Sequence, residues 1–585
     1  MKTKKIFAML LSGVLALSTL VGCGGGGNST TSTGGSSTDT SAESSASGDS
    51  SAANTSGDTQ VLNISVQSFG NNYDVQDMGW RWMMAACYSG LYRNVADADG
   101  EHFVLDGAES VEISDDGTVY TFHLRQDAKW SDGEPVTAHD YEYGWKRLLN
   151  PTYAYDYAVF IFNVVGAEEY YNGEGSVDDV MAVALDDYTF QVTLKEADPT
   201  FESKLVATPL YPTREDIAEA AGDQWGKDWS LCVYNGPFCM SNLVEDNQMT
   251  WTKNENYWDA DNVHLDTVNW YLVAEDSTAA TMFDNGELDV LETSGDYSIK
   301  YQDEAEAGDI QMITTDYPGT ISLAFDFTNG GKSGLLSNVK IRKALAYSIN
   351  REEMIDAVYG RYKPAYSFIA PAITLDGTSY RDQVPELMKD EYEQYAGNNE
   401  ALQELFKEGL EELGMDTDLS QVTITYLSYG STVDSTAFRE YLQQTWQQNL
   451  GINVELNTVG DYSLFTAERD AGNFDVYNSG WSSDYNDPLD FLDTFYTGQY
   501  TSVSGGYSNP EYDALIDSLA GENDTAKRLE IYQQAEQLLM DDCAMIPLYY
   551  QTKEFFLQNW VKDFNWSSFG ASREFIHTYI EGRGN

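Results

Sequence analysis

The chain has 585 residues, and its 94 acidic against 33 basic side chains give a formal net charge of −61 at pH 7. This excess of negative charge argues against nucleic acid as a partner, because phosphates would be repelled. It would also repel an anionic lipid surface, so membrane association calls for a tether, and most of the carboxylates are expected to be solvated.

The amino terminus has the pattern of an export signal. Three lysines occur among the first five residues, and residues 6–21 form an apolar stretch that is short for a transmembrane helix. The stretch ends in LVGC at 20–23, which resembles a lipobox. We therefore predict a lipoprotein signal peptide at 1–22 and lipidation of Cys23, the alternative being an ordinary secretory signal with a chance cysteine.

A low-complexity segment follows. Residues 24–59 are almost wholly Gly, Ser, Thr, Ala, Asn and Asp, so 23–60 is predicted to be a lipidated cysteine followed by a flexible tether. The predicted location is the cell membrane, lipid-anchored on the extracytoplasmic face. The remainder, 61–585, is too long for one hydrophobic core and predicts two or three domains.

The spacing of the cysteines and histidines indicates neither a metal site nor a defined set of disulfide bonds. Beyond Cys23, the four remaining cysteines are either buried thiols or disulfide-bonded, and the sequence does not fix which: Cys87, Cys232, Cys239 and Cys543. The five histidines are scattered, with no pair at metal-ligand spacing. No metal and no cofactor are expected.

The first half, 61–295, reads as short strands with few helices. Alternating apolar residues predict strands at 61–66, 119–124 and 188–194. Residues 137–149 predict a helix, with Thr137 as its cap and an aspartate in its first turn.

The second half alternates helix and strand. Apolar spacing and cap residues predict helices starting after Asn350, around 402–413, around 438–446 and at 462–470, with strands at 422–426, 452–456 and 474–481. This order implies an open, largely parallel sheet with ligand access at one edge.

The most informative segment, 480–488 (GWSSDYNDP), ends the last of these strands. Ligands of open α/β sheets bind just beyond the carboxyl ends of strands. Asp484, flanked by Trp481 and Tyr485, is therefore interpreted as a carboxylate that holds a cation against an apolar wall. Asp487 is interpreted as turn chemistry before the proline.

Common hydrolase signatures are missing. The sequence contains neither His-Glu-x-x-His nor Gly-x-Ser-x-Gly, and its abundant tyrosines and tryptophans suit a binding cleft. We predict that the protein is not an enzyme.

Several motifs resemble those of the oligopeptide-binding proteins of ABC transporters, the family 5 extracellular solute-binding proteins. They are VYTFHLRQDAKWSDGEPVTA at 119–138, NGPF at 235–238, NENYW at 254–258, NVKIRKALAYSINRE at 338–352 and the segment 480–488. The last resembles the peptide-binding branch rather than relatives that take nickel or haem.

The resemblance implies an α/β fold, a two-lobed periplasmic-binding-protein-like clamp of three domains. A discontinuous lobe I would comprise 61–95, 200–295 and 546–585. An additional β-rich domain would span 96–199, and an α/β lobe II would span 296–545.

The same resemblance implies a peptide enclosed between the lobes as an added strand. Asp484 would pair with the peptide α-ammonium, the alternative being a helix cap or a surface carboxylate. The backbone of Gly480 and Ser482 would bond the ligand main chain, as would the segment from Gln76 to Met78. Three aromatic residues would line side-chain pockets unless they are core residues: Tyr157, Trp446 and Trp481.

One position departs from the pattern. Some peptide binders carry an arginine two residues before the Gly-Trp pair to hold the ligand carboxylate, and here that residue is Asn478. The predicted function is capture of oligopeptides by a monomer that delivers them to ABC permease subunits. A peptide sensor, a binder of a sugar or metal complex, and a secreted hydrolase or chaperone are the alternatives.

Overall fold

The computed structural model describes residues 59–70, 72–77, 85–97, 100–293, 295–499, 503–570 and 575–583. The predicted signal peptide, Cys23, most of the tether and Met78 lie outside these ranges. Within them, no helix combines the length and apolar character needed to cross a lipid bilayer.

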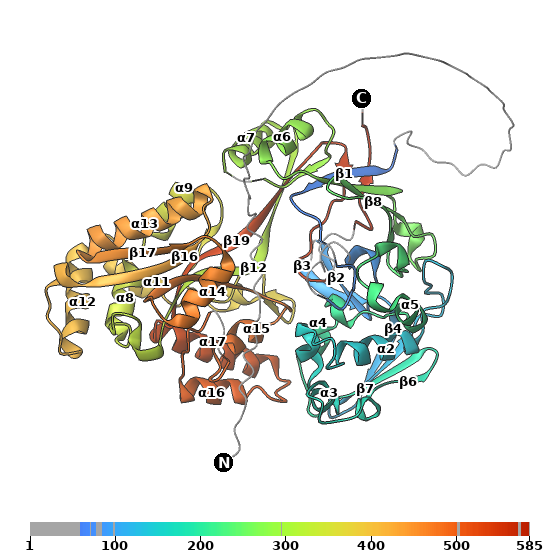
Figure 1. Cartoon of the computed structure of the whole chain (residues 1–585), viewed down its shortest axis with the longest axis horizontal. Helices are drawn as coiled ribbons and strands as arrows, with labels where there is room; N and C mark the ends of the chain where they lie inside the picture. Colours follow the sequence, from blue (N-terminus) through green and yellow to red (C-terminus); the bar gives the residue numbers. More distant parts are fainter. Residues whose placement is uncertain are drawn as a thin grey trace, which may run out of the picture.

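The architecture is the predicted mixed α/β fold with two lobes joined by long strands (Figure 1). One eleven-stranded sheet runs through both lobes in the order β17-β16-β18-β12-β19-β11-β1-β10-β9-β8, with β13 beside β19. Lobe I holds β1 (Val61–Val66), β8 (Phe238–Val244), β9 (Gln248–Lys253), β10 (Thr267–Leu272) and β11 (Val290–Leu291). Lobe II holds β13 (Lys363–Pro364), β16 (Thr423–Tyr429), β17 (Asn453–Val459) and β18 (Val476–Ser482).

Two long strands connect the lobes. Strands β12 (Gln311–Phe325) and β19 (Met545–Leu557) pair antiparallel along most of their length, with a register shift between Asp316 and Thr320. The C-terminal end of β19 pairs with β11 in lobe I. The C-terminal half of β12, from Gly319 to Phe325, pairs with β18 in lobe II. We call β12 and β19 the connecting ribbon.

The prediction of a largely parallel sheet in the second half needs a correction. Strands β16, β17 and β18 are parallel to one another, as the β-α-β order requires. Strand β12, however, pairs antiparallel with both β18 and β19. The ribbon strands do not belong to the βαβ series, so no crossover helix imposes a parallel direction on them.

A second sheet lies beside lobe I and carries much of the predicted β-rich region (Figure 1). Its order is β4-β5-β7-β6, all antiparallel, with helix α2 packed on β6 and β7. These strands are β4 (Ala108–Ile113), β5 (Val119–Leu124), β6 (Ala182–Asp186) and β7 (Thr189–Thr193). The described residues also form three short two-stranded sheets: β2 (Tyr92–Asp97) with β3 (Gly100–Leu105), β14 (Thr374–Leu375) with β15 (Thr378–Ser379), and β20 (Val561–Lys562) with β21 (Tyr579–Ile580).

Local cap chemistry sets the helix starts. Helix α2 (Ala138–Leu148) begins at Thr137, where Asp140 completes the capping box. In lobe II, the side chains of Asn350, Thr432 and Asp461 accept backbone N–H groups at the starts of their helices. These are α9 (Arg351–Val358), α13 (Val433–Leu450) and α14 (Tyr462–Ala471), each close to its predicted position.

Other α-helices of the described residues are α3 (Ala167–Tyr171), α4 (Phe201–Lys204), α5 (Glu215–Ala221), α6 (Asp276–Asp284), α7 (Gly295–Ala307), α8 (Val339–Tyr347), α10 (Tyr380–Gln383), α11 (Lys389–Tyr395), α12 (Asn399–Glu412), α15 (Leu489–Leu492), α16 (Pro510–Asp517) and α17 (Thr525–Asp541). Most buried apolar side chains of the described residues form one continuous cluster that extends through both lobes. The four cysteines left open by the sequence are free thiols: Cys87, Cys232, Cys239 and Cys543.

Candidate ligand-binding site

Strand β18 has one edge that no described strand covers. It pairs with β12 along its whole length, but it pairs with β16 only at Val476 and Tyr477. Residues 478–482 therefore have a strand on one side only.

The hydrogen-bond phase of β18 shows which groups face that edge. Asp326 N donates to Asp475 O, and Ser483 N donates to Pro318 O, both in register with the β12 ladder. In an antiparallel pair, hydrogen-bonded positions alternate, so odd-numbered residues of β18 bond to β12. The N–H and C=O groups of Asn478, Gly480 and Ser482 consequently point toward the uncovered edge.

Gly480 permits the close pairing of β18 with β12. A Cβ at this position would lie 2.9 Å from Thr320 O and 2.9 Å from Ile321 Cδ1. A side chain at position 480 would force β18 away from β12, and the uncovered edge of β18 would be displaced with it.

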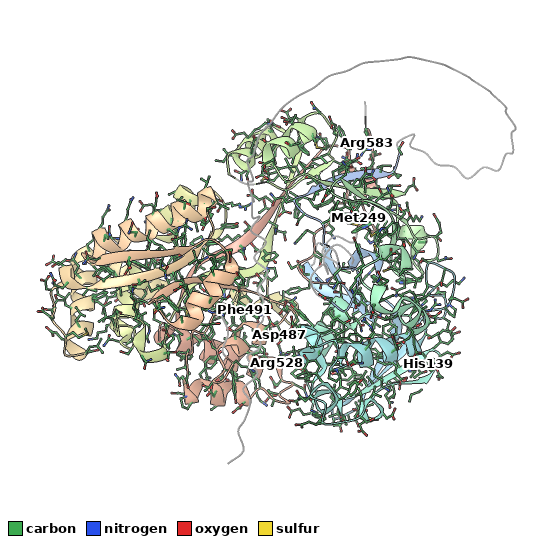
Figure 2. The ribbon with its side chains drawn as sticks, in the orientation of Figure 1. His139, Met249, Asp487, Phe491, Arg528 and Arg583 are labelled. Atoms are coloured by element: carbon green, nitrogen blue, oxygen red, sulfur yellow. The ribbon has the colours of Figure 1, made fainter. Side chains whose placement is uncertain are left out.

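Residues 483–488, which we call the ligand loop, are anchored to lobe II by several hydrogen bonds. Asn486 accepts from Thr374 N at 2.8 Å. Asp487 is buried, accepts from Leu489 N at 2.9 Å as expected for turn chemistry, and forms an ion pair with Arg528 of α17 (Figure 2). Tyr532 Oη also donates to Asp487, at 2.8 Å. These contacts anchor the loop to its own lobe.

Asp484 contacts the β-rich region directly. Tyr157, in the short 3-10 helix η3 (Asp156–Ile161) of the β-rich region, donates its hydroxyl to Asp484 Oδ1 at 2.7 Å. The ring of Phe160 meets Tyr485 edge-on at 5.8 Å between centroids. The ammonium of Lys204 lies 5.1 Å from the Tyr485 centroid. Two predicted site residues, Tyr157 and Asp484, are therefore brought together from sequence positions more than 300 apart.

A third carboxylate, Asp490, lies behind Asp484 and was not anticipated. It is buried in α15, and its Oδ2 accepts three hydrogen bonds: from Trp481 Nε1 at 2.9 Å, Ser483 Oγ at 2.8 Å and Asp484 N at 2.9 Å. The available sequence signal was an aspartate set among Leu489, Phe491 and Leu492, a burial pattern unusual for a solvated carboxylate.

Other predicted site residues lie elsewhere. Trp446 is completely buried in lobe II, where its indole donates to Leu345 O at 3.1 Å, so its burial favours the core interpretation. The Gln76 side chain is also buried: its amide donates to Gly144 O, and Arg147 donates to its Oε1. Its side chain therefore supports the β-rich region, and only its backbone remains a candidate for ligand contact.

Asn478, the departure from the arginine pattern, is half-buried on β18. Its Oδ1 is itself buried and has no hydrogen-bond partner among the described residues.

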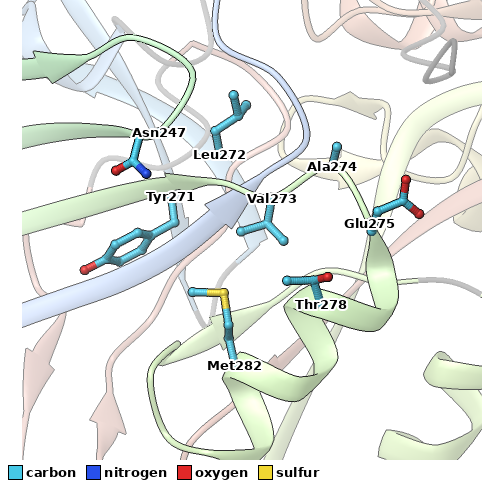
Figure 3. A pocket seen from close by; sticks show the side chains of 8 residues that line it. All are labelled: Asn247, Tyr271, Leu272, Val273, Ala274, Glu275, Thr278 and Met282. Atoms are coloured by element: carbon cyan, nitrogen blue, oxygen red, sulfur yellow. The ribbon is translucent and has the colours of Figure 1, made fainter. Parts of the chain in front are cut away.

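A separate hollow of about 330 Å³ lies far from this loop, beside α6 and the end of β10 (Figure 3). None of the predicted site residues lines it, and its wall combines four apolar residues with four polar ones: Leu272, Val273, Ala274, Met282, Asn247, Tyr271, Glu275 and Thr278. The described residues also contain no group of three or more His, Cys, Asp or Glu side chains placed to hold a metal ion.

Comparison with known families identifies the architecture. Residues 102–502 match the bacterial extracellular solute-binding proteins, family 5. The chain belongs to this family. Its members are binding proteins, which agrees with the two-lobed architecture and the partly uncovered edge of β18.

Relatives and solved structures cover most of the chain. The dipeptide-binding protein DppE of Bacillus subtilis is 32% identical over 445 residues, 76% of this chain and 78% of that protein. The oligopeptide-binding protein OppA of the same organism is 31% identical over 495 residues, 82% of this chain and 84% of OppA. The structure of Listeria monocytogenes OppA bound to peptide superposes with a TM-score of 0.70 at 28% identity, covering 90% of this chain and 99% of that one.

Proposed function

We propose that this family 5 protein captures oligopeptides between its lobes and delivers them to an ABC permease for import. The observation that carries the proposal is the uncovered edge of β18, which leads directly into the loop bearing Asp484. The names of its relatives, which include oligopeptide- and dipeptide-binding proteins, support the same ligand class.

The edge supplies affinity that does not depend on ligand sequence. Peptide N–H and C=O groups would pair with those of Gly480 and Ser482, as in the addition of a strand to a sheet. Main-chain groups are the same in every peptide, so this interaction accepts many sequences. Preference among side chains would come from the surrounding aromatic residues, chiefly Trp481 and Tyr485.

Asp484 would fix the peptide's direction by binding its α-ammonium. Charge-assisted hydrogen bonds are about twice as strong as neutral ones, and they gain further when lobe closure excludes water. The hydroxyl of Tyr157 in the β-rich region already donates to this carboxylate, so the peptide ammonium would join it as a second donor to Asp484.

Lipid anchoring at Cys23 completes the proposal. A tethered receptor remains near its permease although its net charge of −61 opposes association with anionic lipid. We propose the same domain boundaries that the sequence predicted: lobe I comprises 61–95, 200–295 and 546–585, the β-rich domain spans 96–199, and lobe II spans 296–545. The absence of a catalytic signature in the sequence supports a binding role without catalysis.

The proposal is tested by calorimetric titration of tri- to octapeptides against wild type and Asp484→Ala. We expect wild type to bind peptides with free amino termini and the variant to lose at least about 100-fold in affinity, equivalent to about 2.7 kcal/mol. Asp115→Ala, a change at an exposed turn, is the matched control and should bind as wild type does.

Two results would contradict the proposal. The first is the absence of binding by any of the peptides to wild type while a sugar or metal complex binds. The second is equal affinity of wild type and Asp484→Ala, which would remove Asp484 from the site. Peptide binding by the purified protein, together with undiminished peptide import by cells that lack only this protein, would leave the sensor alternative.

A further inference from the structure

Asp490 bonds the end of β18 and the first two residues of the loop that would receive the peptide amino terminus. Its Oδ2 accepts from the side chains of Trp481 and Ser483 and from the backbone of Asp484. Three donors of different origin converge on one oxygen, so the carboxyl group fixes both the strand end and the Asp484 backbone. Asp490 is therefore a positioning residue for Asp484.

The charges around the loop are unevenly balanced. Arg528 of α17 is paired with Asp487, and Lys204 of α4 is paired with Asp198 at 2.8 Å. The three groups that bond Asp490 Oδ2 are all neutral. The further titratable groups around the loop are Tyr157, Tyr485, Asp493 and Tyr532.

We propose that Asp490 couples peptide capture to proton release: it holds a proton while the site is empty and gives it up when an ammonium group binds at Asp484. This inference rests on the proposed function, because it assigns the bound cation to a peptide amino terminus. Asp490, the second carboxylate, then becomes ionised only when the ammonium group bound at Asp484 is present to balance its negative charge.

The direction of titration agrees with this geometry. Burial, and then repulsion from Asp484, raise the pKa of Asp490 to about 8, while the three hydrogen bonds oppose the rise. At pH 7 the empty site is therefore mainly protonated at Asp490. A bound ammonium stabilises the ionised form, so the pKa falls and the proton leaves for solvent.

The number of protons released on peptide binding can be calculated from typical pKa shifts. A nearby opposite charge lowers a carboxyl pKa by about 1 to 3 units, so Asp490 would release about 0.4 to 0.9 proton at pH 7. A peptide α-amine has a pKa of about 7.7 to 8.0, so its own binding as ammonium takes up about 0.1 to 0.2 proton. Wild type should then show net release of about 0.2 to 0.8 proton per peptide, from the same estimates.

The test is calorimetric titration of tri-, tetra- and penta-alanine at pH 7 in phosphate and in Tris, which differ in ionisation enthalpy. The change in observed enthalpy between buffers gives the number of protons exchanged. Asp490→Asn keeps an oxygen that can accept the three hydrogen bonds but cannot titrate. It should convert net release to net uptake of about 0.1 to 0.2 proton.

The matched control is Asp493→Asn, an exposed carboxyl in the neighbouring turn that lies close to Lys204. It should retain the wild-type proton release. If Asp490→Asn does not fold, Asp490→Ser serves as the non-titrating variant.

Each result of these titrations supports or contradicts either the role of Asp490 or the proposed peptide binding. Peptide binding by wild type without net release overturns the inference, as does unchanged release in the Asp490 variant or its loss in Asp493→Asn. Failure of all three peptides to bind counts against the proposed peptide-binding function itself. Binding with release in wild type and net uptake in the Asp490 variant supports both.

Discussion

The buried ion pair between Asp487 and Arg528 offers a sharp test of how the ligand loop is held. Both side chains are about nine-tenths buried, with exposures of 7% and 8%. Tyr532 lies between them, receiving a hydrogen bond from Arg528 at 2.7 Å and donating to Asp487 at 2.8 Å. Asp487→Ala removes the only carboxylate in this triad.

The magnitude follows from the charge left behind. Burial lowers the pKa of the Arg528 guanidinium, but Asp487 and Tyr532 outweigh burial and raise it overall, so Arg528 is charged at any ordinary pH. Removal of one partner of a buried pair costs about 3–5 kcal/mol, because the other charge remains without compensation. We expect that loss in the free energy of unfolding of lobe II.

The assay is urea unfolding at pH 7 followed by tryptophan fluorescence, applied to Asp487→Ala, Arg528→Met and the double variant. The double variant should be more stable than the sum of the single losses predicts, with a coupling of at least about 2 kcal/mol. A loss below about 1 kcal/mol for Asp487→Ala, or additive losses, would refute the assignment of Asp487 as a structural anchor. Asp484→Ala, three positions earlier, should change stability by less than about 1 kcal/mol.

Three further predictions concern the same lobe and its contact with the β-rich region. Trp446→Ala should lower the free energy of unfolding by about 3–5 kcal/mol in urea titrations while folded protein keeps its peptide affinity; a selective loss of affinity would restore Trp446 to the site. Tyr157→Phe removes a hydroxyl bonded to a carboxylate and should weaken peptide binding by about 10-fold in calorimetry, with unchanged affinity as the contrary result. Because folding raises the pKa of Asp490 to about 8, its stabilising contribution is complete below about pH 4 and is lost as pH rises to about 8. Asp490→Asn should therefore gain stability relative to wild type between pH 5 and pH 8, and a constant difference in urea titrations would contradict this sign.

Local signals predicted the secondary structure of both halves well. The capping residues Thr137 and Asn350 lie where α2 and α9 begin, and the alternating run at 119–124 forms β5 with the predicted limits. These features depend on neighbours within a few residues, so a sequence contains them directly.

The antiparallel direction of β12 and the burial of Asp490 could not be predicted from neighbouring residues in the sequence. Strand β12 is antiparallel to β18 because it belongs to the connecting ribbon, which depends on contacts with residues over 200 positions away. Asp490 is buried because α15 packs on α17 and beneath the ligand loop. The exposure of one side chain on a short helix is set by such distant packing and not by its own spacing.

The same limit explains the different outcomes for the aromatic candidates. Trp446 repeats at helical spacing with Phe438 and Leu442, a pattern that equally describes a core face, and burial selects the core. Tyr157 has no such periodic partners. Its role depends on the approach of a separate region to lobe II, which only the assembled fold contains.

The connecting ribbon and the ligand loop share one hydrogen bond, from Ser483 N to Pro318 O. Pro318 lies within the register shift of β12, where the ribbon leaves its regular pairing. A change in the angle between the lobes would bend this ribbon and move the carbonyl that holds Ser483. Ligand binding at the neighbouring Asp484 would then be linked, through one backbone hydrogen bond, to the strand pair that joins the lobes.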